Sequence, residues 1–240
     1  MDGKELSLSL LFCIFSIVNC CIENTFNNTA VTLVGAKDIR TITGCFEPTE
    51  DLVKVSYIQI VNESVPILRR GAINGLPNLV DVVLERNSMQ DIDPDSFYNL
   101  PKLYLIKIKQ NNIRVLREGV FNGLNLTELC LTDNNIEIIY PNAFDDMPKL
   151  SILFLNENKI TRWRSDWFKR SPQVSVLNFE YNLITTVPYR CLQNVKSSHL
   201  IGNVRVDTNV QLNNNRIKKI EDGAFEGLEM LGWLFLHKTK

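Results

Sequence analysis

The residues best suited to catalysis or metal binding are few in this chain and are not arranged for either. His199 and His237 are the two histidines, and neither has a cysteine or carboxylate at the spacing of metal ligands. The sequence contains no nucleophile elbow, zinc-protease helix or glycine-rich phosphate loop. The adjacent carboxylates Asp145 and Asp146 are expected to be solvated. The sequence therefore predicts a protein that is not an enzyme and that uses no metal and no cofactor.

A basic and aromatic segment, RWRSDWFKR from Arg162 to Arg170, has the composition of a polyanion-binding patch. Trp163 and Phe168 fall at core positions of the repeat described below, which favours a structural role with a solvated charged rim. Contact with a nucleic acid or a glycosaminoglycan is the alternative. The whole chain argues against a nucleic-acid partner, because 26 basic and 27 acidic residues leave a net charge of -1.

The N-terminus has the features of an export signal. Leu6–Val18 is a run of thirteen residues without a charge, which is short for a membrane span of about 20 residues and typical of a signal-peptide core. The small residues Val18 and Cys20 place cleavage before Cys21, so residues 1–20 are the predicted signal peptide. No later apolar run approaches the length of a membrane span. We therefore expect a secreted, extracellular product with no membrane span in this chain.

Three asparagine sequons agree with export. The predicted glycosylation sites are Asn27, Asn62 and Asn125.

Most of the chain repeats itself. The pattern is L-x-x-L-x-L-x-x-N-x-I, and one copy consists of Leu126, Leu129, Leu131, Asn134 and Ile136. The position of the asparagine recurs at 63, 87, 111, 134, 158, 182, 215 and 239, so the spacing is 24 except for one interval of 23 and one of 33. Ten residues after it, most copies carry a large apolar residue: Ile73, Phe97, Phe121, Phe144, Phe168, Leu192 and Phe225. A fixed period of this length indicates a solenoid.

This pattern resembles the leucine-rich repeat family, in the 24-residue form found in extracellular proteins such as Toll receptors, Slit and small leucine-rich proteoglycans. The resemblance covers residues 55–240, as about seven complete copies and one truncated copy. It implies an α/β repeat solenoid, a curved horseshoe with a parallel concave β-sheet and loops or short helical turns on the convex side.

The repeated asparagine is expected to lie inside the coil. Its amide group both donates and accepts, so it can bond backbone groups that would otherwise be buried and unpaired, at a cost of about 1–3 kcal/mol each. The predicted structural ladder consists of Asn87, Asn111, Asn134, Asn158, Asn182 and Asn215.

The resemblance also implies a cap before the first repeat, at residues 21–54, because the end of a solenoid exposes its core. Such a flank is typically closed by a disulfide in exported members of the family, and here the bond would join Cys21 and Cys45. The fuller four-cysteine pattern of the family is missing.

Two irregular regions leave alternatives open. The interval of 33 places an insertion near residues 196–209, which is either a projecting functional loop or an irregularity of the gene model. The eighth repeat is unfinished at Lys240, so the chain is a fragment, a truncated isoform, or half of a homo- or hetero-oligomer that covers this C-terminal edge.

Side chains on the outward side of the strands form the candidate ligand-binding surface, because alternate residues of a strand face opposite ways. Apolar residues cluster in its middle between charges, which marks an interaction site, although scattered surface apolars need no explanation. The candidates are Tyr57, Val83, Leu105, Lys107, Glu128, Cys130, Ile152, Phe154, Val176 and Asn178. Cys130 is expected to be an exposed free thiol that cannot reach Cys191.

The leading hypothesis is a secreted or cell-surface recognition scaffold that binds an extracellular protein ligand or receptor on its concave face. The resemblance implies a role in innate immunity, signalling or adhesion. The alternatives are a structural component of the extracellular matrix, a fragment of a larger transmembrane receptor ectodomain, and, less favoured, a regulatory or inhibitory module of an enzyme.

Overall fold

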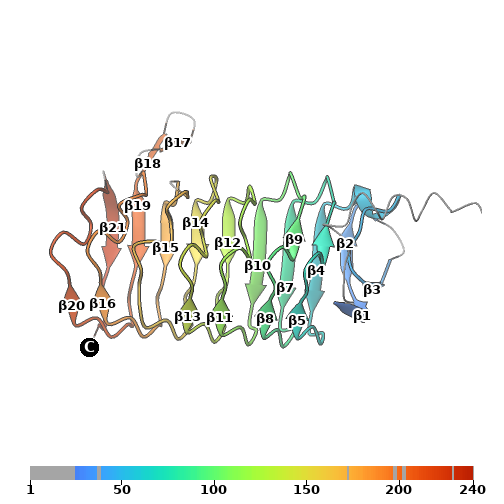
Figure 1. The fold of residues 1–240 in the computed structure, drawn as a ribbon, viewed down its shortest axis with the longest axis horizontal. Coiled ribbons are helices and arrows are strands. Elements are labelled where there is room, and N and C mark those ends of the chain that lie inside the picture. The colour runs from blue at the N-terminus through green and yellow to red at the C-terminus, as the bar shows by residue number, and fades with distance from the viewer. Residues whose placement is uncertain are drawn as a thin grey trace, which may run out of the picture.

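The chain winds into a solenoid in which each turn adds one strand to a common sheet (Figure 1). The computed structural model describes residues 25–36, 39–171, 173–196, 199–201, 204–228 and 230–239. The signal peptide predicted for residues 1–20 lies outside the described residues.

One sheet of nine strands forms the concave side. All its neighbouring strands are parallel except β2, which runs antiparallel to β4. In spatial order, the strands are β2 (Thr32–Val34), β4 (Tyr57–Val61), β7 (Asp81–Glu85), β10 (Leu105–Lys109), β12 (Glu128–Cys130), β14 (Ile152–Phe154), β15 (Val176–Asn178), β19 (Thr208–Gln211) and β21 (Leu231–Phe235). The expected parallel sheet of a leucine-rich solenoid is confirmed.

The opposite side of the coil consists of turns and very short strands, so of the two expected forms, loops or short helical turns, the structure has the loops. Among the described residues, the only helix is the 3₁₀ helix η1 (Leu52–Lys54), which lies before the first repeat. Backbone groups on this side bond to the neighbouring turn, as when Tyr140 N–H donates to Leu116 O at 2.9 Å. The short parallel pairs are β5 (Ile67–Leu68) with β8 (Asp91–Ile92), β6 (Ile73–Asn74) with β9 (Phe97–Tyr98), β11 (Val115–Leu116) with β13 (Ile138–Ile139), and β16 (Thr186–Val187) with β20 (Lys219–Ile220).

The core lies between these two sides. Leu129 and Leu131 are completely buried, as the alternation of the strand requires. The aromatic column packs ring against ring, with centroids 6.2 Å apart for Phe97 and Phe121. Full burial of such side chains contributes about 1.5–3 kcal/mol each, so this stacked interior supplies most of the stability of the coil.

The repeated asparagines are buried at the edge of this core. Asn158 shows the arrangement: its Oδ1 accepts from Ile136 N–H at 2.9 Å, and its Nδ2 donates to Leu131 O at 3.0 Å and Leu155 O at 3.1 Å. Both Ile136 and Leu131 belong to the preceding turn. One side chain therefore ties two turns together and satisfies backbone groups that water cannot reach.

A column of left-handed residues stands directly before these asparagines. The φ angles lie between 46° and 61° among the positive-φ residues other than glycine. Residues with a side chain pay about 1–2 kcal/mol for this conformation, so each turn stores a small strain where it bends off the sheet. The column consists of Asn62, Arg86, Gln110, Asp133, Glu157, Tyr181, Asn214 and Lys238.

The N-terminal flank closes the first turn. Strand β1 (Phe26–Ala30) pairs antiparallel with β3 (Thr41–Gly44), and β2 continues the concave sheet. The rings of Phe26 and Phe46, both fully buried, meet edge to face with centroids 5.3 Å apart. Cys45 is disulfide-bonded. Cys21 lies outside the described residues, so its pairing with Cys45 stays a prediction.

The inserted residues form a hairpin. Strands β17 (His199–Ile201) and β18 (Val204–Val206) pair antiparallel, and Figure 1 shows them projecting from the coil beyond the end of β19. The coil then resumes in register, with Asn209 beside Val176. The insertion is therefore an excursion that leaves the sheet intact.

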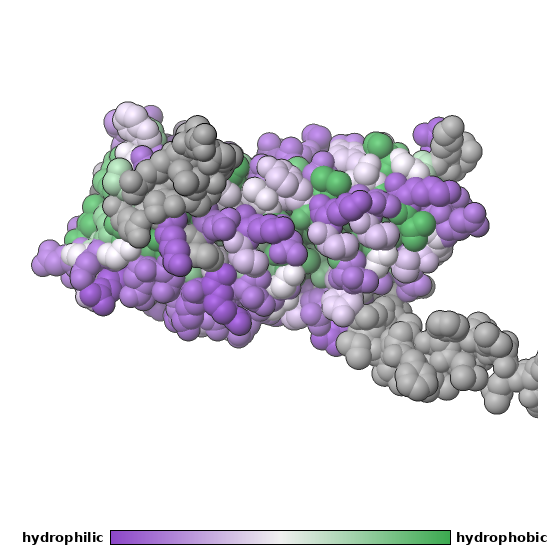
Figure 2. Space-filling view, turned by 90° about the horizontal axis from the view of Figure 1, so that it is seen from above, coloured by the Kyte–Doolittle hydropathy of each residue, from purple (hydrophilic) through white to green (hydrophobic). Residues whose placement is uncertain are grey.

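The C-terminal turns are less closed. Ile220 has 42% of its surface exposed, and Phe225 is only partly buried. Trp233 is 67% exposed. Figure 2 shows apolar surface at this end of the coil. Among the described residues, no turn lies beyond β21 to cover these side chains.

Candidate functional site

Outward side chains of the sheet stand in columns, because its parallel strands are in register. Two such columns run along the sheet from β4 to β21. The first consists of Tyr57, Asp81, Leu105, Glu128, Ile152, Val176, Asn209 and Trp233. The second consists of Gln59, Val83, Lys107, Cys130, Phe154, Asn178, Gln211 and Phe235.

The charged residues of the sheet are confined to β7, β10 and β12. They are Asp81, Glu85, Lys107, Lys109 and Glu128. Lys107 Nζ lies 3.0 Å from Glu85 Oε1, and this hydrogen bond is the main cause that raises the pKa of Lys107. These two charges therefore satisfy each other within the chain.

Asp81 differs from this pair. Its side chain is half-buried, and no hydrogen bond or ion pair reaches its carboxylate from the residues described. Burial raises its pKa, because desolvation penalises the charged form. The pKa of the neighbouring Tyr57 is raised by burial and by the charge of Asp81. Asp81 is thus a half-buried carboxylate with no counter-charge in contact among the described residues.

The strands of the second half of the sheet carry no charge, and Glu180, two residues after β15, is half-buried and accepts a hydrogen bond from Asn213. Strands β14, β15, β19 and β21 contain no Asp, Glu, Lys or Arg. Ile152, Phe154 and Val176 are half-buried neighbours in its columns. At its end the rings of Trp233 and Phe235 are stacked, with centroids 6.2 Å apart. This arrangement offers apolar contact area, and aromatic anchors tend to dominate the energy of interfaces.

Two predicted surface residues are in fact buried. Cys130 and Val83 each expose 7% of their surface. Lys107 lies beside both in the register, and Phe154 lies on the other side of Cys130, so long side chains flank these short ones. The Sγ atom of Cys130 also lies 3.3 Å from Thr132 Oγ1. The predicted exposed thiol is therefore wrong.

Both described cysteines outside the cap are free thiols. Cys130 and Cys191 are each buried and unbonded to another cysteine. Burial raises the pKa of Cys191 to about 12, so this thiol is protonated at neutral pH and a poor nucleophile.

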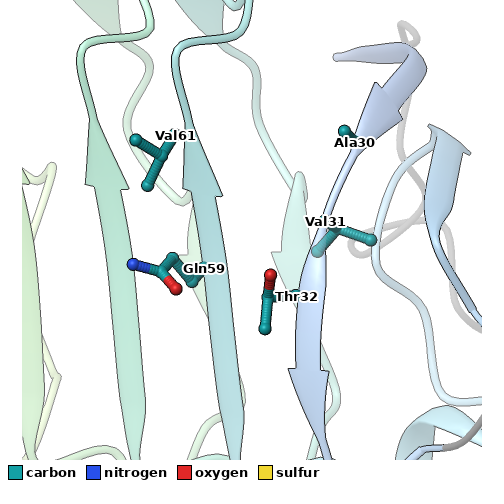
Figure 3. Close-up of a pocket in the computed structure, with 5 residues that line it drawn as sticks. All are labelled: Ala30, Val31, Thr32, Gln59 and Val61. Carbon is teal, nitrogen blue, oxygen red and sulfur yellow. The ribbon is translucent and has the colours of Figure 1, made fainter.

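A hollow at the N-terminal end of the sheet was not predicted. Its volume is about 260 Å³, and Figure 3 shows its lining residues, which come from two sources. Ala30, Val31 and Thr32 belong to the cap, and Gln59 and Val61 belong to β4. The repeat pattern cannot reveal such a site, because the pairing of Thr32 with Gln59 joins the sheet to a segment outside the repeat.

The basic and aromatic segment is largely structural. Trp163 and Phe168 are buried, as predicted. Arg164 donates two hydrogen bonds to Asp166 at 2.9 and 2.7 Å. These bonds hold the pKa of Asp166 below its usual range.

Asp145 pairs with the other end of this segment. Its carboxylate accepts from the backbone N–H of Arg170 at 2.7 Å and from Arg170 Nε at 3.1 Å. Asp145 is buried, so the expectation that it is solvated is wrong. Two of the basic residues in the segment are already neutralised within the chain, which weakens the case for a polyanion site there.

The remaining predicted residues lie at the surface, or their side chains are not among those that the structure describes. Asn27, Asn62 and Asn125 are all exposed, as glycan acceptors must be. His237 is exposed, and the side chain of His199 is not among those described. Within the described ranges, no group of three His, Cys, Asp or Glu side chains could hold a metal ion.

Comparison with known proteins agrees with this geometry. The leucine rich repeat family model matches residues 101–160 and 148–201. Toll-like receptor 13, solved in complex with ssRNA13, superimposes with a TM-score of 0.62 at 25% identity, over 75% of this chain and 25% of that chain. Toll, from the Toll–Spätzle complex of Drosophila, superimposes with a TM-score of 0.63 at 17% identity, over 76% of this chain and 24% of that chain.

The chain thus spans about a quarter of the length of these two structures. No curated protein sequence matches it. In the part of the chain that the structure describes, no helix has the length and apolar character that crossing a membrane requires.

Proposed function

Since this chain is a leucine-rich repeat protein whose coil resembles Toll ectodomains, we propose that it is a recognition scaffold that binds a protein ligand on its concave sheet. The observation that carries the proposal is the charge-free half of the sheet, where Ile152, Phe154 and Val176 are adjacent and half-buried. Apolar groups bordered by charged strands form the usual anatomy of an interface, with an apolar centre and a polar rim.

A protein partner fits this surface better than a nucleic acid. The Toll-like receptor 13 structure contains ssRNA and the Toll structure contains Spätzle, so coils of this kind hold ligands of both classes. Nucleic-acid binding draws its affinity from Lys and Arg at phosphates. In this chain the apolar strands have no basic residue, and Lys107 is already paired with Glu85.

The site of action that we propose is outside the cell. The predicted signal peptide at residues 1–20, the exposed sequon asparagines and the disulfide at Cys45 support secretion of a glycoprotein. A role in innate immunity, signalling or adhesion is part of this proposal. Expression in a secretory host with N-terminal sequencing of the medium and treatment with an N-glycosidase tests it, and an intracellular, unglycosylated product would contradict it.

The experiment that tests recognition compares two substitutions of the same type. Ile152→Asp places a charge in the proposed interface, whereas Ile138→Asp places one on β13, where the side chain is 52% exposed on the other side of the coil. With a partner recovered by affinity capture from extracellular fluid, we expect Ile152→Asp to weaken binding by about 30-fold or more, as for a central interface residue. Ile138→Asp should change it by less than twofold.

The outcome is judged only in variants that keep the unfolding midpoint of the unmodified protein. Equal binding by the two variants would show that the partner does not bind on the apolar half of the sheet.

Apolar groups on and beside β21 support a second proposal, in which the chain assembles with itself or another chain, as in a structural matrix component. Leu231, Leu234 and Leu236 are only partly buried beside the exposed Trp233, and exposed apolar groups that cluster mark interaction sites. Light scattering across a range of protein concentrations tests this. A monomer at all concentrations, with no change on Trp233→Glu, would contradict it.

A further inference from the structure

The hollow between the cap and the first coil has the dimensions of a side-chain pocket. Its volume of about 260 Å³ lies just below the range of roughly 300–1,000 Å³ that is usual for small-molecule sites. A single aliphatic side chain with part of its backbone fits this space. The pocket lies on the outward side of the sheet, where Thr32 stands beside Gln59 in the register (Figure 3).

The lining selects an uncharged group. Ala30, Val31 and Val61 supply aliphatic walls, and no charged side chain lines the pocket. Thr32 and Gln59 add a hydroxyl and an amide, which together donate and accept hydrogen bonds. Neither side chain has a hydrogen-bond partner among the described residues. Aliphatic walls with an unused donor and acceptor suit an aliphatic side chain attached to a peptide group.

The unpaired carboxylate of Asp81 lies close to this pocket. Asp81 is the neighbour of Tyr57 in the register, and Tyr57 is two residues from Gln59 on β4. Neighbouring strands lie about 4.8 Å apart and two residues along a strand span about 7 Å, so Asp81 lies about 8 Å from Gln59, which is close to the spacing of alternate side chains in an extended peptide. The raised pKa of Asp81 agrees with a carboxylate that has lost part of its hydration and found no counter-charge.

We propose that the pocket and Asp81 together anchor an extended segment of the protein partner that presents an aliphatic side chain near a basic one. The aliphatic side chain enters the pocket, its peptide group bonds Thr32 and Gln59, and the Lys or Arg side chain pairs with Asp81. The cap thereby contributes half of a binding site in addition to sealing the core. This inference rests on the proposed function, because it names a second contact of the same partner surface.

The test uses a displayed library of random short peptides, selected against the intact immobilised protein. Selection should enrich peptides with an aliphatic residue near a Lys or Arg. Binding of an enriched peptide should fall by at least about tenfold on Ala30→Trp, which fills the pocket, and by a similar factor on Asp81→Asn. Raising the salt concentration should weaken binding to the unmodified protein more than to Asp81→Asn.

Ile138→Trp is the control, because it adds the same ring to an exposed position on the other side of the coil. Each variant must keep the unfolding midpoint of the unmodified protein. No enrichment, enrichment without the aliphatic and basic pair, or full binding by both Ala30→Trp and Asp81→Asn would each overturn the inference.

Failure of this inference is distinguishable from failure of the proposed function. If the captured partner is lost on Ile152→Asp but bound normally by Ala30→Trp and Asp81→Asn, the recognition role stands and the anchor is wrong. If it is lost on Ala30→Trp but kept on Ile152→Asp, the anchor stands and the apolar half of the sheet is not the interface.

Discussion

The two ends of the coil use the same repeat but differ in how well they bury it. Leu84 and Leu236 occupy the same position of the pattern, and Leu84 is fully buried whereas Leu236 is only partly so. At the N-terminal end, β2 and the ring pair of Phe26 and Phe46 cover the first turn. At the other end, β21 has a single described neighbour, β19. A leucine in the pattern thus stabilises the coil only to the extent that the next turn covers it.

The largest expected difference between the ends comes from aromatic truncation. Phe46→Ala should lower the free energy of unfolding by about 3–5 kcal/mol, because it empties a fully buried site against Phe26. Phe235→Ala should cost less than about 1 kcal/mol, because the ring is only partly buried. Urea denaturation followed by circular dichroism measures both. Equal losses would mean that the two ends are equally closed.

The asparagine ladder should show how far the poorly covered end reaches into the coil. Asn111 accepts from Met89 N–H at 3.1 Å and donates to Leu84 O at 2.9 Å. Asn111→Ala leaves these groups buried and unpaired, so we expect a loss of about 2–4 kcal/mol in the free energy of unfolding.

Asn215→Ala is the matched change near the open end. Asn215 is 3% exposed, and its partners Ile184 N–H and Phe179 O belong to fully buried residues, so we expect a loss of similar size in the same urea titration. A much smaller loss for Asn215→Ala would mean that the poorly covered end already includes this turn.

Glycine substitution in the left-handed column should stabilise the covered part of the coil. Gln110 has a φ of 55°, and Gln110→Gly removes a strain of about 1–2 kcal/mol while adding about 0.5–1 kcal/mol of backbone entropy cost. We expect a net gain of about 0.5–1 kcal/mol in thermal unfolding.

Two changes serve as comparisons for that gain. Lys238→Gly, in the last turn and with a φ of 54°, should change the unfolding temperature less. Fewer neighbouring residues fix the backbone of this turn, so the strain there contributes less to the stability of the fold. Lys109→Gly, in the adjacent strand β10, should destabilise the protein. A loss of stability on Gln110→Gly would show that the left-handed residues are not strained.

The smallest expected effect is a dependence on pH near the closed end. The pKa of Asp81 is raised by burial, so the folded state holds this proton more tightly than the unfolded state does. The free energy of unfolding therefore falls as pH rises through the pKa of Asp81 in the folded state. Asp81→Asn should raise the free energy of unfolding slightly at neutral pH, and the variant should show a smaller decrease with pH.

Thermal unfolding from acid to neutral pH checks this, with Asp222→Asn, an exposed residue in a late turn, as the control. If Asp81→Asn lowers stability at neutral pH, the carboxylate has a stabilising partner and is not available to a ligand.

The repeat predicted the columns of the sheet well, because a fixed spacing decides which residue stands beside which. Ile152, for example, is one period of 24 residues from both Glu128 and Val176 in the sequence, and the register pairs it with both. Burial within a column was harder to predict, because it depends on the size of the neighbours. Cys130 lies between Lys107 and Phe154, and these long side chains cover it.

The left-handed column and the pocket could not be predicted from the sequence. The left-handed column carries Arg86, Gln110, Glu157 and Tyr181 among its members, and none of these residue types favours positive φ. The pocket depends on how the cap meets β4, which occurs once in the chain and repeats nowhere. Periodicity therefore predicts what recurs, whereas single contacts such as Thr32 with Gln59 require the structure.

The β17–β18 hairpin is a suitable place to attach a label to the protein. After the hairpin, β19 pairs with β15 in the regular register. The pairing of the sheet therefore does not depend on the number of residues between Val195 and Asp207. Lengthening a surface loop costs little entropy, about 0.6 kcal/mol for each doubling. A fluorescent reporter or an affinity tether spliced into this loop would leave the concave columns in place, so partner capture could be monitored without labelling the surface that is being tested.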